Sequence, residues 1–270
     1  MIGRLKQGVQ RAFNALGYRL ERLDGPPPPH RLELDPSYGP IIGRVKPFTM
    51  TSCERIGSLI DAVRHVSATG VPGAIVECGV WRGGSMMAAA LALLEACDPR
   101  ELYLFDTYAG MTAPTERDLD HRGGAAEATY RETQTDEGSE WCYASVQEVT
   151  ANLLSTGFPL ERCHFIKGDV LETIPARAPN AIAVLRLDTD WYASTRHELT
   201  HLFPRLQPGG ILIIDDYGHW SGCRQAVDEY FGDRRPFMFS IDFSGRAMVK
   251  PAEASGDFRT DGANVAARVR

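Results

Sequence analysis

The fold of this chain is decided by residues 74–85, which read AIVECGVWRGGS. Ala74–Cys78 is a short apolar run of the kind that forms a buried strand, and the glycines that follow it favour a turn. The small and apolar residues of Ser85–Ala96 then predict a helix. A strand that passes through a glycine-rich turn into a helix is typical of proteins in which strands and helices alternate.

The same alternation continues on both sides of this stretch. Strands are predicted at residues 102–105, 163–167, 181–187 and 211–214, and helices at 52–69, 145–155, 195–203 and 224–231. Residues 237–241 and 246–249 are predicted to pair as a final antiparallel hairpin. These elements predict an α/β protein with a doubly wound, mostly parallel sheet that helices cover on both faces.

The composition limits the classes of function. The chain has 270 residues, of which 43% are hydrophobic, so it can bury one large core. A net charge of −6 without a basic face argues against a nucleic-acid partner. The sequence has no run of about 18 apolar residues, which argues against a membrane span. The six cysteines form no CxxC pair, and free thiols in a reducing cytoplasm are expected rather than disulfides.

Three regions are predicted along the chain. Residues 1–30 form an extension with a basic amphipathic helix and the proline-rich linker Pro26–Pro29; the helix packs on protein or, alternatively, lies on a membrane. Residues 31–251 form the α/β domain, and residues 252–270 form a polar tail for which disorder is expected. Residues 109–141 have no apolar period and are interpreted as a lid over an active site or as a solvated insertion.

The carboxyl ends of the predicted parallel strands carry residues suited to a nucleotide-like ligand. Glu77 and Gly79 end the first strand, where glycines and a helix N-terminus allow close approach of a ligand. Asp106 ends the second strand and could bind the two hydroxyls of a ribose. Asp169 and Val170 follow the third and could contact an adenine amine and ring. The alternative for Asp106 is a helix or turn cap. The spacing differs from G-x-G-x-x-G, which disfavours a nicotinamide-dependent oxidoreductase.

Acidic residues also end the next two strands. Asp188 follows the strand at 181–187, and Asp215 and Asp216 follow the strand at 211–214. So much negative charge at one sheet edge is costly unless a cation lies among it, and hard oxygen donors suit Mg²⁺ or another hard divalent cation. The alternative is that Asp188 and Asp190 cap the helix that follows them and that Asp215 and Asp216 belong to a turn and a cap.

Two further residues are candidates for catalysis. Asp190 lies two residues beyond Asp188, so it could reach an acceptor hydroxyl without binding the metal, as a general base does. His219 follows the Asp pair and could contact the substrate or serve as an alternative base. A loop histidine can also be merely a polar surface residue.

Four segments together resemble a known family, and the resemblance covers roughly residues 40–250. They are the segments VECGVWRGGS at 76–85, LFDTYAGM at 104–111, LDTDWY at 187–192 and IDDYG at 214–218. They resemble the macrocin, mycinamicin and novobiocin O-methyltransferases. The combination of acids and glycines at the strand ends also looks like the S-adenosylmethionine site of class I methyltransferases, whose Rossmann-like sheet has seven strands with the last antiparallel.

The resemblance implies that Mg²⁺ binds to Asp188, Asp215 and Asp216, with Asp190 as the base. It implies methyl transfer from S-adenosylmethionine to a deoxysugar hydroxyl of a small-molecule glycosylated acceptor, and a homodimer or higher homo-oligomer. The implied cofactor contacts are Met50, Glu77, Gly79, Gly83, Ser85, Asp106, Thr107, Asp169, Val170 and Asp188. A phenol, catechol-like or polysaccharide hydroxyl is the alternative acceptor, and a non-catalytic binding subunit is the alternative function.

Overall fold

The computed structural model of the chain describes residues 36–136, 138–234 and 236–252. The helix and proline-rich linker predicted within residues 1–30 lie outside the described residues, as does the tail from residue 253 onward.

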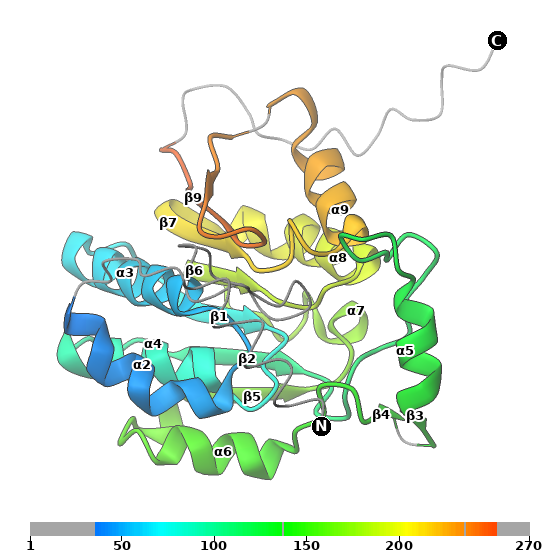
Figure 1. Cartoon of the computed structure of the whole chain (residues 1–270). Coiled ribbons are helices and arrows are strands. Elements are labelled where there is room, and N and C mark those ends of the chain that lie inside the picture. Colours follow the sequence, from blue (N-terminus) through cyan, green and yellow to red (C-terminus); the bar gives the residue numbers. More distant parts are fainter. Residues whose placement is uncertain (1–35, 137, 235, 253–270) are drawn as a thin grey trace, which may run out of the picture. The chain divides into compact units, whose positions relative to one another are not determined.

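A seven-stranded sheet forms the centre of the described fold (Figure 1). The strands run in the order β5-β2-β1-β6-β7-β9-β8, and the first five of these are mutually parallel. Strand β9 is antiparallel to both β7 and β8. The strands are β1 (Ala74–Cys78), β2 (Leu102–Asp106), β5 (Cys163–Lys167), β6 (Ile182–Leu187), β7 (Leu206–Ile214), β8 (Phe239–Ser240) and β9 (Arg246–Val249). The doubly wound, mostly parallel sheet with a terminal hairpin is therefore confirmed.

Helices cover both faces of the sheet, and each face has its own hydrophobic core (Figure 1). One core lies under α2 (Gly39–Val45), α3 (Cys53–Thr69), α4 (Gly84–Glu95) and α6 (Val146–Leu154). The other lies under α7 (Val170–Thr173), α8 (Tyr192–Leu202) and α9 (Ser221–Phe231). Single 3-10 turns occupy Pro36–Tyr38, Lys46–Phe48, Leu160–Arg162, Phe203–Arg205 and Gly232–Arg234. None of the helices in the described part of the chain is both long enough and apolar enough to cross a membrane.

Residues 109–141 contain more regular structure than their sequence predicts. They include helix α5 (Ala126–Thr133) and a short hairpin of β3 (Gln134–Thr135) and β4 (Gly138–Ser139). Helix α5 buries only Ala126, so it has no apolar period for the sequence to reveal. Helices α2 and α7 also escaped prediction. Strand β7 begins at Leu206 rather than at residue 211, because Leu206 already pairs with Ile182.

The register of the central strands brings the predicted acids to one edge of the sheet. Leu187 at the end of β6 pairs with Cys78 of β1 on one side and with Ile214 of β7 on the other. The next residues of these strands, Gly79, Asp188 and Asp215, are therefore neighbours. A Cβ atom on Gly79 would lie 2.0 Å from the Asp188 carbonyl oxygen, so this close approach requires glycine.

Candidate functional site

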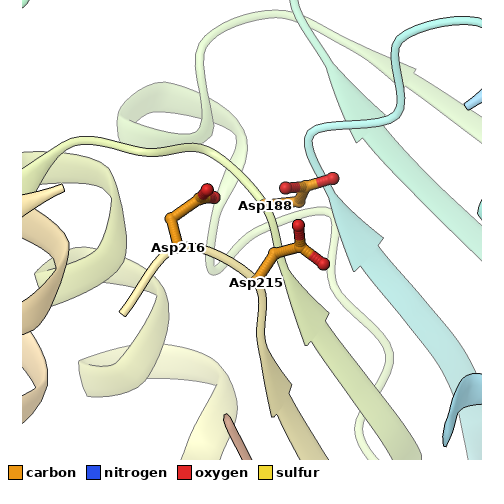
Figure 2. A group of neighbouring side chains, drawn as sticks. All are labelled: Asp188, Asp215 and Asp216. Carbon is orange, nitrogen blue, oxygen red and sulfur yellow. The ribbon is translucent and has the colours of Figure 1, made fainter. Parts of the chain in front are cut away.

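Three carboxylates converge where β6 and β7 end. One oxygen each from Asp188, Asp215 and Asp216 lies within 4.8 Å of the others, and Figure 2 shows the three side chains around one small space. The Oδ2 atom of Asp216 is buried and has no hydrogen-bond partner among the described residues. Three hard oxygen donors, one of them unpaired, fit a divalent cation such as Mg²⁺. The proximity predicted from the sequence is thus present.

Two arginines already lie against these carboxylates, and the sequence interpretation missed both. The Arg186 guanidinium donates to Glu77 at 2.5 Å, to Asp188 at 2.6 Å and to Asp215 at 2.5 Å. Arg55 of α3 donates to the other oxygen of Asp215. The expected cation among these acids is therefore supplied in part by the protein itself, because Arg55 and Arg186 offset part of the negative charge.

The strand register explains how Arg186 reaches three acids. Arg186 pairs with Glu77 of β1 and with Ile213 of β7, so their side chains share one face of the sheet. Asp188 and Asp215 lie two residues further along their strands and point to that same face. The signal was present in the sequence, since an arginine inside the apolar run 181–187 must be paired if it is buried.

Asp190 lies beside Asp216, and both side chains line the same cavity. Burial raises the pKa of Asp190 to about 7, and the negative charges of Asp188 and Asp215 add to this effect. Burial and the neighbouring Asp190 and Asp215 likewise raise the pKa of Asp216. Asp190 has a φ of +69°, a left-handed conformation that is uncommon for a residue other than glycine.

A cavity of about 350 Å³ opens beside the acidic cluster. Its wall includes Asp190, the three converging aspartates and, from the glycine-rich turn and α4, Gly79 and Ser85. Met50 also lines it and is 63% exposed. The 48–51 segment can lie against α4 because Gly84 has no side chain: a Cβ there would be 2.6 Å from the Phe48 carbonyl oxygen.

A smaller cavity adjoins the first and is lined by Thr107, Asp169 and Val170. Asp106 lines both cavities. Its carboxylate accepts from the backbone N–H groups of Val80 at 2.6 Å and Tyr108 at 2.7 Å. Asp106 therefore fixes the glycine-rich turn, as its capping alternative predicted, while it also faces the cavity. Asp169 likewise lines its cavity and caps α7 through the Leu171 N–H at 2.9 Å.

Two residues predicted to contact a cofactor are not at either cavity. Glu77 is fully buried against Arg186, and burial, opposed by that arginine, raises its pKa to about 7. Gly83 faces α6 instead, where an added Cβ would lie 3.0 Å from Val149 Cγ1. Both residues contribute to the site indirectly. Glu77 binds Arg186, and Gly83 allows α4 to pack closely on α6.

His219 lies in the wall of the larger cavity. Its ring is 5.0 Å from that of His121, which comes from the 109–141 segment. Burial, together with the neighbouring His121, lowers the pKa of His219, so the neutral imidazole is favoured at pH 7. The position suits a contact with an acceptor.

Comparison with known proteins shows that this chain is similar to O-methyltransferases. The model of the family described as Macrocin-O-methyltransferase (TylF) matches residues 43–245. The 8-demethyl-8-(2,3-dimethoxy-alpha-L-rhamnosyl)-tetracenomycin-C 4'-O-methyltransferase of Streptomyces olivaceus is 36% identical over 71% of this chain and 72% of its own length. The mycinamicin III 3''-O-methyltransferase of Micromonospora griseorubida is 36% identical over 67% of this chain and 69% of its own. The solved O-methyltransferase NovP has a TM-score of 0.65 and 31% identity, covering 76% of this chain and 83% of NovP.

Proposed function

Because the chain belongs to the macrocin-O-methyltransferase family, we propose that it methylates a deoxysugar hydroxyl of a glycosylated natural product, with Mg²⁺ bound by Asp188, Asp215 and Asp216. Family membership confirms the resemblance read from the sequence and makes the chain an S-adenosylmethionine-dependent O-methyltransferase. The observation that carries the metal part of the proposal is the convergence of three carboxylates beside the Gly79 turn.

Each side chain has a distinct part in the proposed reaction. Mg²⁺ held by the three aspartates would lower the pKa of an acceptor hydroxyl bound to it. Asp190 accepts the proton of the acceptor hydroxyl, and the oxygen of that acceptor forms a bond to the methyl carbon of S-adenosylmethionine as the carbon–sulfur bond breaks. The products are a methyl ether and S-adenosylhomocysteine. The donor is proposed to lie along Gly79, Ser85 and Asp106, with its adenine near Asp169 and Val170.

The deoxysugar is proposed from a relative. The Streptomyces olivaceus enzyme is named for an acceptor that carries a rhamnosyl group, and rhamnose is a deoxysugar. The exposed side chains of Met50 and Phe243 line the larger cavity and offer apolar surface to such a ring. A homo-oligomer and a cytoplasmic location remain predictions from the sequence.

The test follows transfer of a labelled methyl group from S-adenosylmethionine to rhamnosylated polyketides, with catechol and simple phenols as comparison acceptors. We expect turnover of a sugar acceptor that stops in excess EDTA and returns with Mg²⁺. In Asp188→Asn, turnover should be lost while S-adenosylhomocysteine still binds. Full activity in EDTA would refute the metal role, and methylation of phenols alone would refute the sugar acceptor. Binding of NAD in place of S-adenosylmethionine would refute both.

A further inference from the structure

Asp118 is a fully buried carboxylate in the 109–141 segment that has no part in the chemistry proposed above. Its oxygens accept three hydrogen bonds. The N–H and hydroxyl of Thr115 donate to Oδ2 at 2.7 and 2.8 Å, and the N–H of Tyr192 donates to Oδ1 at 2.8 Å. Taking a carboxylate out of water is costly unless hydrogen bonds replace the lost water. The three donors around Asp118 therefore indicate that its buried position has a structural role.

The Tyr192 bond joins the 109–141 segment to the first turn of α8. Helix α8 starts with Tyr192, and its N-cap residue Trp191 supplies no side-chain cap. Asp118 supplies the cap instead, from 74 positions away in the sequence. Asp190 was a candidate for this capping role. With α8 capped by Asp118, the Asp190 carboxylate is available to face the cavity.

Space for Asp118 is built into helix α9 as well. Gly222 lies in its first turn, and a Cβ atom there would be 1.9 Å from Asp118 Oδ1. On either side of Asp118, the Ser221 hydroxyl donates to the Arg117 carbonyl at 2.5 Å and accepts from the Leu119 N–H at 3.0 Å. The carboxylate thus lies between the starts of two helices, where the helix dipoles favour negative charge.

A second bond reaches the same loop. The Trp191 indole N–H donates to the Thr112 carbonyl at 3.0 Å. Both residues that follow Asp190 are therefore hydrogen-bonded to the 109–141 segment. Asp190 itself has a φ of +69°, and a strained conformation of this kind persists only where its surroundings impose it.

We propose that Asp118 is a positioning residue: by capping α8 from the 109–141 segment, it fixes the backbone that aims Asp190 at the acceptor hydroxyl. The inference rests on the proposed function of Asp190 as the base. It gives the first part of the 109–141 segment a catalytic purpose, which is to hold the base in place.

The test compares Asp118→Ala and Asp118→Asn with Ser145→Ala, which removes the cap of α6, a helix that contributes no residue to the wall of either cavity. A displacement of about 1 Å can cost about 100-fold in rate. We therefore expect kcat of Asp118→Ala on a rhamnosylated polyketide to fall at least about tenfold, with little change in KM for S-adenosylmethionine. Asp118→Asn should recover part of this loss, because its amide oxygen can still accept from Tyr192. Ser145→Ala should retain the wild-type kcat.

Amide hydrogen exchange provides a readout that needs no acceptor. Exchange of residues 188–196 should accelerate in Asp118→Ala and stay unchanged in Ser145→Ala. If Asp118→Ala does not fold, Thr115→Val removes one donor to the carboxylate and should shift both readouts in the same direction. Wild-type kcat and wild-type exchange in the folded Asp118 variants would overturn the inference. An inactive wild-type chain would refute the proposed function alone, and the exchange comparison would still decide whether Asp118 fixes this backbone.

Discussion

Replacement of Arg186 by methionine should cost far more stability than the loss of an ordinary ion pair. The guanidinium is 3% exposed and lies 2.5–2.6 Å from carboxylate oxygens of Glu77, Asp188 and Asp215. Burial alone would lower the pKa of Arg186. The three acids raise this pKa by more than burial lowers it, so Arg186 is charged. Methionine fills similar space and leaves three carboxylates without their shared partner.

Removing one partner of a buried ion pair typically costs about 3–5 kcal/mol. In a domain of this size each kcal/mol lowers the melting temperature by about 2–4 °C, so Arg186→Met should melt roughly 6–20 °C below the wild type. Chemical and thermal unfolding in EDTA measure the change without any contribution from a bound metal.

Arg131→Met is the matched control, because Arg131 donates to Glu127 at 2.6 Å on the exposed surface of α5. An exposed pair contributes about 0–1 kcal/mol, so this variant should melt close to the wild type. If Arg186→Met also lost less than about 1 kcal/mol, the claim that Arg186 offsets the acidic cluster would be refuted.

Three other expectations concern single residues around the site. Asp190→Asn should lower kcat by about 10²–10⁴-fold while calorimetry finds unchanged S-adenosylhomocysteine binding, and a wild-type kcat would remove Asp190 as the base. Gly79→Ala should abolish that binding, because its Cβ would lie 2.0 Å from the Asp188 carbonyl oxygen; normal affinity in this variant would contradict the close approach. Burial alone would raise the pKa of Asp242, but Arg55 and nearby N–H and hydroxyl donors lower it below 3.8. The stability that Asp242 contributes is therefore present above pH 3.8, and it is lost as the pH falls through the lower pKa of Asp242 in the folded protein. The loss of unfolding free energy caused by Asp242→Asn should therefore shrink in that pH range, which unfolding measured at several pH values would show.

The sequence was informative where local pattern and topology agree. Apolar runs that end in acids predict buried parallel strands, and the strand alternation then requires Asp188 and Asp215 to meet at one edge. The sheet and the proximity of the three acids could be predicted for this reason. Gly79 was predictable as well, because a glycine directly after a strand indicates close approach of another group.

Other parts of the site depend on pairings that a single sequence does not reveal. Asp118 lies in a polar stretch without periodicity, and its partner Tyr192 is 74 positions away. Arg55 looks like an ordinary charged residue of a helix until α3 packs beside Asp215. Arg186 did carry a signal, since it stands inside an otherwise apolar strand, but its three partners follow only from the strand register.

Titration of the protein with Mn²⁺, followed by electron paramagnetic resonance, tests most directly whether the three acids hold a divalent cation in spite of the two arginines. We predict saturable binding of a single ion per chain that weakens at least about tenfold in Asp216→Asn, whose side chain keeps the shape and loses the charge. Absence of saturable binding in the wild type, or equal binding in Asp216→Asn, would contradict the account.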